Sequence, residues 1–410
     1  MSPGTVIVGS SVAGVRTAQA LRTEGYDGDV VLVGEESALP YDKPPLSKGL
    51  LAGAAAADGI GLLSEAGASD LGVRLVLGRA ARRLDVAGHY VELADGERLR
   101  YDDVVIATGA RARPSPWGQP PGVHVLRTLD DAIALRDDLR LGGPLVVIGA
   151  GFIGAEVAAT ARGIGLEEVT LVDPVPVPMS RVLHPAVAGR FGALHRERGV
   201  TTRFGTGVAG IDHGPGGLNI RFTDGSSVPA ATVVVGIGSV PNEGWLKSSG
   251  LRVADGVVCD PYSRVAGAPG VHAAGDVARW FHPGHRALVR AEHWTNAVEQ
   301  AACVAHNIAH PGEPRPYAPV EYVWSDQYGW KIQIAGRTGG DLRPVTVERA
   351  DGTGSFAVLY AAADGRLAGA VTVNWPRALL TARRALAAGQ PLDEVQQAVA
   401  TLQVKPSVHS

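Results

Sequence analysis

Two segments of this chain repeat one pattern, in which an apolar strand runs into a glycine-cornered turn, a helix and a second strand. The first copy covers residues 5–36, as TVIVGSSVAG, VRTAQALRTEG and VVLVGEE, and the second begins with PLVVIGAGFIGAEVAATARGIG at residue 144. Each copy predicts a βαβ unit with parallel strands and a right-handed crossover. Two such units in 410 residues predict an α/β fold with two Rossmann-like domains, and hence two nucleotide sites or one ancestral duplication.

The first turn runs from Gly9 to Gly14, where a helix N-terminus would present its backbone N–H groups to a pyrophosphate. Gly9 permits the sharp turn, and Gly14 lets the helix pack closely on the strand. Ser11 stands where the middle glycine is usual, although its hydroxyl could donate a hydrogen bond to phosphate. Glu35, at the end of the next strand, is the predicted ligand of the ribose hydroxyls. The alternative is an ordinary strand–helix turn followed by a solvated acid.

The second turn carries the full GxGxxG pattern at Gly149, Gly151 and Gly154, in the strand–helix context that the pattern requires. Asp173 ends the following strand, where a carboxylate accepts from a ribose 2′-hydroxyl and repels a 2′-phosphate. The next residues, PVPVP, supply no arginine for such a phosphate. This turn therefore predicts NADH binding in preference to NADPH.

The remaining chain reads as hairpins, buried strands and two further helices. Residues 90–111 and 220–242 each predict a hairpin leading into a buried strand, and VHAAGDVA at 271–278 places Asp276 after a strand, at a helix start. Helices are predicted at 296–310 and 377–389, with strand-like segments at 321–336, 355–360 and 365–374. The Pro-rich stretch at 310–320 predicts a boundary.

Composition and cysteine content narrow the class of protein. Hydrophobic residues make up 45% of the chain and charged residues 19%, with a net charge of −3 that gives no reason to expect nucleic acid. Residues 5–8 predict a strand and not a signal peptide, and no apolar run reaches the length of a membrane span. We therefore expect a soluble, cytoplasmic protein. The two cysteines, Cys259 and Cys303, form no CxxC pair, so a redox disulfide is not expected.

Six further motifs give the chain a family resemblance. They are PYDKPPLSK (40–48), ATG (107–109), GIGSVPN (236–242), AAGD (273–276), RAEHWTNAVEQA (290–301) and VWSDQYGWKIQIAG (323–336). Together with the two turns they resemble the FAD-dependent NADH–ferredoxin reductases, the branch of two-dinucleotide-binding flavoproteins that includes putidaredoxin and rubredoxin reductases. The resemblance covers nearly the whole chain.

The resemblance implies three domains and a set of cofactor-binding residues. The FAD-binding domain would comprise residues 1–112 and 241–318, the NADH-binding domain 113–240, and a C-terminal α+β interface domain 319–410. The residues implied to surround FAD are Gly9, Ser11, Ala13, Gly14, Glu35, Lys43, Lys48, Ala81, Arg127, Asp276, Trp294 and, beside the isoalloxazine, Trp324. Those implied for NADH are Gly149, Gly151, Ile153, Gly154, Glu156, Asp173 and Arg181. The resemblance also implies that the cofactors are bound by four further motif residues, Thr108, Gly109, Gly238 and Gly275.

The resemblance also implies a mechanism and a partner. Lys48 would lie near the flavin, paired with Glu156, and these two are the predicted catalytic residues. The family often has arginine where this chain has Lys43. Electrons would pass singly to an iron–sulfur ferredoxin that supplies a cytochrome P450 or a Rieske-type oxygenase. Because ferredoxins are generally acidic, a basic patch is expected, with Arg377, Arg383 and Arg384 as candidates or merely as a solvated helix face.

Three other functions share parts of this pattern. A disulfide reductase would need a cysteine early in the chain, and none precedes Cys259. A membrane-associated quinone reductase would need an amphipathic or apolar C-terminal anchor, whereas residues 393–410 are polar. An NADH-sensing flavoprotein of the apoptosis-inducing-factor type would act through a binding partner. No metal is predicted, because His282, His285 and the other histidines show no metal-ligand spacing.

Overall fold

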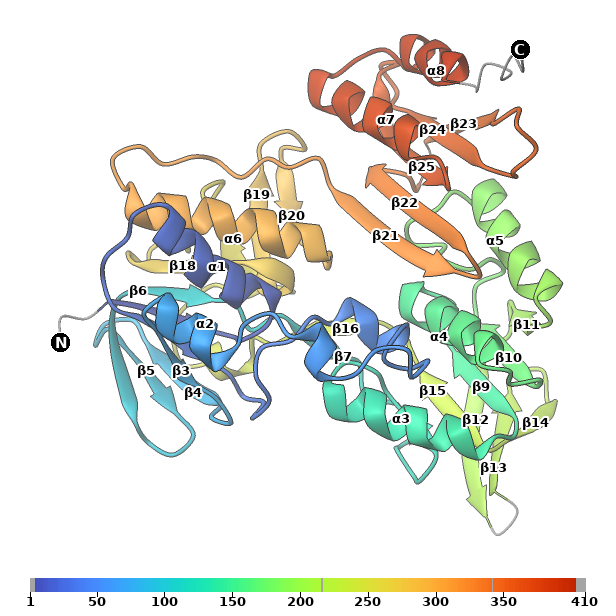
Figure 1. Cartoon of the computed structure of the whole chain (residues 1–410), viewed down its shortest axis with the longest axis horizontal. Coiled ribbons are helices and arrows are strands. Elements are labelled where there is room, and N and C mark those ends of the chain that lie inside the picture. The colour runs from blue at the N-terminus through green and yellow to red at the C-terminus, as the bar shows by residue number, and fades with distance from the viewer. Residues whose placement is uncertain (1–3, 215–216, 341, 403–410) are drawn as a thin grey trace. The chain divides into compact units, whose positions relative to one another are not determined.

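The computed structural model describes residues 4–214, 217–340 and 342–402 and is drawn in Figure 1. The chain divides into two compact units, each built from separate stretches of sequence. Unit 1 comprises residues Met1–Pro44, Ala56–Arg111 and Ser239–Pro319, and unit 2 comprises Pro45–Ala55, Ala112–Gly238 and Val320–Ser410.

Unit 1 is built on a parallel sheet in which β1 lies between β2 and β6. The sheet order is β3-β2-β1-β6, with β18 added in parallel to β6 and the hairpin β4–β5 continuing from it in antiparallel fashion. Helices α1 and α6 lie side by side (Figure 1). The strands of this sheet are β1 (Gly4–Val8), β2 (Val30–Val33), β3 (Val73–Val76), β4 (Ala81–Asp85), β5 (Tyr90–Leu93), β6 (Arg98–Ile106) and β18 (Val271–Ala273).

Shorter elements complete unit 1. Strands β17, β19 and β20 form a second sheet, and β7 pairs with β16. The remaining elements are β7 (Ala110–Ala112), β16 (Ser239–Pro241), β17 (Val257–Cys259), β19 (Ala278–His282), β20 (Ala287–Val289), α1 (Val12–Thr23), α2 (Glu65–Asp70), α6 (Trp294–Ala309), and the 3₁₀ turns η2 (Asp58–Ile60), η3 (Gly244–Leu246) and η4 (Gly275–Val277). A further 3₁₀ turn, η1 (Pro44–Ser47), begins at the last residue of the first stretch of unit 1 and continues into unit 2.

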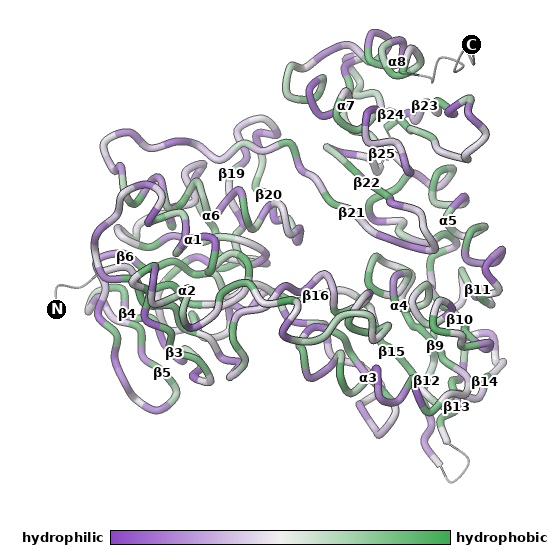
Figure 2. Tube along the Cα trace, viewed as in Figure 1, coloured by the Kyte–Doolittle hydropathy of each residue, from purple (hydrophilic) through white to green (hydrophobic). Residues whose placement is uncertain are grey.

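Unit 2 begins with a second parallel sheet of the same kind, in the order β11-β10-β9-β15-β8. Its central strand β9 is buried at every residue and appears in green in Figure 2, because a strand covered on both faces is apolar throughout. The elements here are β8 (Val123–His124), β9 (Leu145–Ile148), β10 (Val169–Asp173), β11 (Thr201–Phe204), β12 (Val208–Gly214), β13 (Gly217–Phe222), β14 (Ser227–Ala230), β15 (Thr232–Val235), α3 (Leu129–Leu141), α4 (Phe152–Gly163) and α5 (Pro185–Glu197).

The C-terminal part of unit 2 is an antiparallel sheet in the order β21-β22-β25-β24-β23, with α7 and α8 packed on it. Phe191 of α5 meets Trp330 of this sheet edge to face, at 5.7 Å between ring centroids, so α5 and the sheet share one apolar core. The elements are β21 (Tyr322–Gln327), β22 (Trp330–Gly336), β23 (Arg343–Glu348), β24 (Phe356–Ala361), β25 (Leu367–Val373), α7 (Pro376–Ala388) and α8 (Leu392–Thr401).

The predicted α/β fold with two Rossmann-like units and a C-terminal α+β part is confirmed, and the expected helices appear as α6 and α7. One local prediction is wrong. The helix expected to start at Asp276 is a single 3₁₀ turn, η4, after which the chain enters β19. It stays extended because β19 pairs with both β17 and β20. Of the polar C-terminal stretch, residues 403–410 lie outside the described residues.

A buried histidine on α5 gives unit 2 a predicted acid sensitivity. His195 is fully buried, with its Nδ1 2.9 Å from the hydroxyl of Tyr328. Burial lowers the pKa of His195 from 6.5 to about 4, because the charged ring would lose its hydration. As the pH falls from 6.5 towards 4, the unfolded chain takes up a proton that the folded chain does not, and stability is lost. The loss approaches about 3 kcal/mol.

We expect the unfolding free energy of unit 2 to fall over this range, and a His195→Gln variant to lose most of that slope. Denaturant titrations at several pH values, followed by tryptophan fluorescence, would measure it. His213→Asn, which changes an exposed histidine of β12, is the control. An unchanged slope in His195→Gln would refute the assignment.

Candidate functional site

The first turn is a place where two backbone segments come too close for a side chain. Gly9 follows β1 with φ of 123°, and a Cβ there would lie 2.1 Å from the carbonyl oxygen of Ala107. A Cβ on Gly14 would lie 1.8 Å from the carbonyl oxygen of Gly9. Both positions therefore exclude every residue except glycine. Helix α1 begins at Val12, within this turn, and the helix start has neither a side-chain capping hydrogen bond nor an acidic residue.

The second turn repeats this geometry in unit 2. Gly149 has φ of 102°, and its Cβ would lie 2.3 Å from the carbonyl oxygen of Gly236, while a Cβ on Gly154 would lie 1.9 Å from the carbonyl oxygen of Gly149. A Cβ on Gly151, the N-cap of α4, would meet nothing within 4 Å. Since α4 also starts without a side-chain cap or an acidic residue, its N-terminus suits an anion.

Ser11 occupies in the first turn the place of Gly151 in the second. It is the N-cap of α1, has extended backbone angles and makes no capping hydrogen bond with its side chain. Its hydroxyl is thus not used to close the helix end. Both turns fit a dinucleotide pyrophosphate. Each offers a helix N-terminus at the carboxyl ends of the parallel strands, at the point where the strand order reverses.

The predicted ribose-binding acids lie beside these turns. Asp173 ends β10, and its carboxylate accepts N–H groups from Ala150 at 2.8 Å and from Val175 at 2.9 Å. These bonds hold the carboxylate against the second turn. Glu35 follows β2 and is exposed. The neighbouring Glu36, which was not predicted, accepts from Tyr41 at 2.5 Å and pairs with Lys43 at 3.2 Å.

Three motifs of unit 1 contact one another or the first turn. A Cβ on Gly275 would lie 3.0 Å from Cβ of Ala13 in α1, so the AAGD segment packs directly on the start of that helix. The N–H of Gly275 donates to the side chain of Gln300 in α6 at 3.0 Å. At the opening of α6, Trp294 donates its indole N–H to Asp42 at 2.7 Å.

The ATG and GIGSVPN motifs are locked together by two reciprocal hydrogen bonds. Thr108 donates through its hydroxyl to the carbonyl oxygen of Asn242 at 2.8 Å, and the Asn242 amide donates to the carbonyl oxygen of Thr108 at 2.9 Å. Asn242 also donates its backbone N–H to Gly109. Asn242, Asp42 and Gln300 were not predicted as site residues, although each belongs to a motif already noted.

Glu156 on α4 is a buried charged group of unit 2 and is only 3% exposed. The Lys48 ammonium lies 2.9 Å from its Oε1. Ser47 donates to Oε2 at 2.5 Å, and Ser325 of β21 donates to Oε1 at 2.7 Å. Thr160, one turn further along α4, donates to the carbonyl oxygen of Ser47 at 2.7 Å. The pairing of Lys48 with Glu156, which the resemblance implied, is present.

The remaining predicted residues lie on several different elements. Ala81 opens β4, and Arg127 lies in unit 2, where its backbone N–H donates to Asp131 beside the N-cap of α3. Trp324 lies on β21, with its ring stacked 6.1 Å from that of Tyr322. Ile153, in the first turn of α4, is 43% exposed.

Two further predicted residues adjoin one another. A Cβ on Gly238 would lie 3.3 Å from the guanidinium of Arg181, which places this cation beside the GIGSVPN backbone. An arginine at that position can meet a negatively charged ligand of the second turn.

Comparison with known proteins now gives the family. Residues 4–301 match the pyridine nucleotide-disulphide oxidoreductase family, and residues 322–407 match the reductase C-terminal family. The chain belongs to the pyridine nucleotide-disulphide oxidoreductase family. Within that family it is similar to rhodocoxin reductase of Rhodococcus erythropolis, at 39% identity over 98% of this chain and 94% of the relative.

Two further relatives agree with this assignment. The ferredoxin–NAD(+) reductase component of a p-cumate 2,3-dioxygenase system of Pseudomonas putida is 37% identical over 92% of each chain. The crystal structure of a covalent putidaredoxin reductase–putidaredoxin complex matches with a TM-score of 0.90 at 32% identity, covering 98% of this chain and 100% of the other.

The family name refers to a redox disulfide that this member does not contain. Its two cysteines, Cys259 and Cys303, are both free thiols. Burial raises the pKa of Cys303 to about 11 and that of Cys259 further, so neither is a thiolate at neutral pH. Electron transfer in this chain therefore has to proceed without cysteine chemistry.

Among the described residues, no helix has the length and apolar character needed to span a bilayer.

The close contact at Gly154 gives a test of the second turn. A Gly154→Ala change pushes a methyl group into the carbonyl oxygen of Gly149, and overpacking of this kind costs roughly 1–3 kcal/mol. We expect NADH affinity to fall about tenfold or more while FAD content stays unchanged, as measured by equilibrium titration and by flavin absorbance. Gly163→Ala, at the other end of α4 with nothing within 4 Å, is the control. Equal affinities of the two variants would contradict this account of the turn.

Proposed function

We propose that this chain is an NADH-dependent ferredoxin reductase. It takes hydride from NADH onto FAD and delivers single electrons to a small iron–sulfur ferredoxin that serves a cytochrome P450 or a Rieske-type oxygenase. The observation that carries the proposal is the pair of glycine-cornered turns of matching geometry in a chain without a redox disulfide. Two relatives of near full-length similarity are named as reductases of such systems.

The cofactors divide between the two turns. In our proposal residues 1–112 and 241–318 bind FAD, residues 113–240 bind NADH, and residues 319–410 form the interface domain. Bound FAD supplies the chemistry that links a two-electron donor to a one-electron acceptor. The chain supplies two helix N-termini for the pyrophosphates, together with Glu35 and Asp173 for the ribose hydroxyls. The carboxylate of Asp173 also disfavours the 2′-phosphate of NADPH.

Lys48 and Glu156 act as one unit in this proposal. Glu156 has three donors, so its buried charge is satisfied, and in return it fixes the position of the Lys48 ammonium. The Lys48 side chain keeps 22% of its surface exposed and can still face a bound ligand. We assign to Lys48 the stabilisation of negative charge on the reduced cofactor, and to Glu156 the positioning of Lys48. No acid–base residue is needed, because hydride transfer requires mainly orientation and exclusion of water.

A second candidate function is an NADH-sensing flavoprotein that acts through a binding partner. Fold alone does not separate it from a reductase. The length over which this chain matches reductase components favours the reductase.

We also propose that the protein works in the cytoplasm, where NADH and reduced ferredoxins are available.

Ferredoxin dependence distinguishes the two functions. We expect purified holoprotein, with NADH and a panel of small [2Fe–2S] ferredoxins, to reduce cytochrome c only when a ferredoxin is added, and NADPH to support much less activity. Steady-state absorbance at the cytochrome band would measure the rate. Slow turnover with every ferredoxin, together with a long-lived charge-transfer band after NADH addition, would favour the sensing protein and contradict the reductase.

The role of Lys48 can be tested separately from the fold. A Lys48→Ala variant should bind FAD normally but be reduced by NADH at least about tenfold more slowly, because one charged stabilising group is lost. Stopped-flow absorbance of the flavin would measure this rate. Lys247→Ala, which changes an exposed lysine of unit 1, is the control. An unchanged reduction rate in Lys48→Ala would remove this residue from the mechanism.

A further inference from the structure

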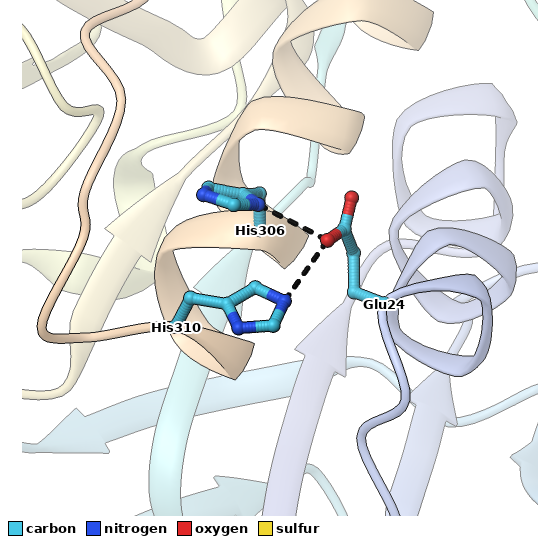
Figure 3. A group of neighbouring side chains, drawn as sticks. All are labelled: Glu24, His306 and His310. Carbon is cyan, nitrogen blue, oxygen red and sulfur yellow. Dashed lines mark hydrogen bonds and ion pairs between the residues drawn. The ribbon is translucent and has the colours of Figure 1, made fainter.

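We propose that Glu24, His306 and His310 form a binding site for a divalent transition metal, of which Zn²⁺ suits the donor set best. The three side chains come from the C-terminal ends of two packed helices of unit 1. Glu24 is the C-cap of α1, and His306 and His310 lie one turn apart at the end of α6. Figure 3 shows all three side chains pointing toward one another.

The distances suit a single small cation. Nδ1 of His306 and Nε2 of His310 each lie 3.0 Å from the same oxygen, Oε2 of Glu24. The three ligand atoms all lie within 4.8 Å of one another. A tetrahedral Zn²⁺ with bonds of about 2.0–2.2 Å holds its donor atoms roughly 3.3 Å apart. The two nitrogen–oxygen distances are therefore within a few tenths of an ångström of the spacing that an ion requires.

The two hydrogen-bond partners of His306 leave room for a cation between its ring and Glu24. Its Nε2 lies 3.2 Å from the backbone carbonyl oxygen of Glu313, and a carbonyl oxygen can only accept, so this nitrogen carries a hydrogen. In a neutral ring the other nitrogen, Nδ1, then presents a lone pair to the Glu24 carboxylate. Two acceptors face each other at 3.0 Å unless a proton or a metal lies between them. Histidine ligands of metals commonly donate their second N–H to a backbone carbonyl in this way.

The three residues differ in exposure in a way that suits metal entry. The His306 side chain is 6% exposed and is held in place, whereas that of His310 is 44% exposed and that of Glu24 30%. Two imidazoles and one carboxylate leave a fourth position open to water. Nitrogen and oxygen donors of this kind favour zinc, copper and nickel over magnesium and calcium.

A metal here would tie together two packed helices, of which α1 begins in the first turn. Helix α1 begins at the first turn, and α6 begins with Trp294. Binding to the folded form alone would raise the stability of unit 1 in proportion to the logarithm of metal concentration. The sequence did not predict this site because Glu24 lies far from the histidines along the chain, and only the packing of α1 on α6 brings them together.

The test uses the full-length holoprotein and ZnCl₂, without any turnover assay, so its outcome is independent of the proposed reductase function. Competition with a zinc-indicator dye should give one bound Zn²⁺, with affinity lowered about tenfold or more in His310→Asn and in Glu24→Gln. His213→Asn, at an exposed histidine of β12, should bind zinc as the parent does. The unfolding midpoint should rise with zinc in the parent and in His213→Asn, but not in His310→Asn.

Two outcomes would overturn the proposal. The first is no zinc binding by the parent protein, which would leave a proton as the cation shared by His306 and Glu24. The second is unchanged zinc affinity in His310→Asn and Glu24→Gln, which would place the metal elsewhere. Because His310 is largely exposed, its replacement should not disturb folding, and unchanged flavin absorbance of that variant would verify this.

Discussion

A carboxylate that is almost withdrawn from water holds unit 2 together around its second turn. An isolated buried charge costs several kcal/mol, so Glu156 can remain on the inner face of α4 only while donors surround it. Lys48, Ser47 and Ser325 supply them from two different parts of the chain. Removal of any one donor would leave the charge undersatisfied. The segment that carries Lys48 and the strand that carries Ser325 are thereby tied to the helix that begins at the GxGxxG turn.

The same steric constraint, a backbone contact that leaves no space for a Cβ, is present in both turns. In each turn, the first glycine lies so close to the chain that follows the neighbouring strand of the sheet that a Cβ would collide with a carbonyl oxygen. The same closeness brings a helix N-terminus to the edge of the sheet, where its partial positive charge is available to phosphate. Of the three glycine positions of the pattern, the turns differ only at the middle one, where Ser11 stands in place of glycine. That serine makes no capping bond with its side chain, so the difference has not altered the helix start.

Elements that depend on local interactions could be predicted from the sequence, whereas features that depend on contacts between distant segments could not. The βαβ units, α6 and α7 follow from local apolar periodicity and glycine placement, and they were predicted. The prediction of a helix at Asp276 was wrong, because Ala278–His282 pairs with β17 and with the following strand β20, and strand pairing overrides a local preference. The hydrogen bond from Tyr41 to Glu36 was not predicted, because it depends on where the side chain of Tyr41 is placed.

By itself the sequence determined the two glycine-cornered turns, the absence of a redox cysteine pair and the motif set that identifies the family. These features are written in residue types and short spacings, which survive without coordinates. Only the tertiary structure decided which side chains meet. It brought Ser325 to Glu156, Gln300 to Gly275, and Glu24 to the two histidines of α6. Each of these contacts joins residues distant in sequence, so its existence depends on how helices and strands pack and not on any local pattern.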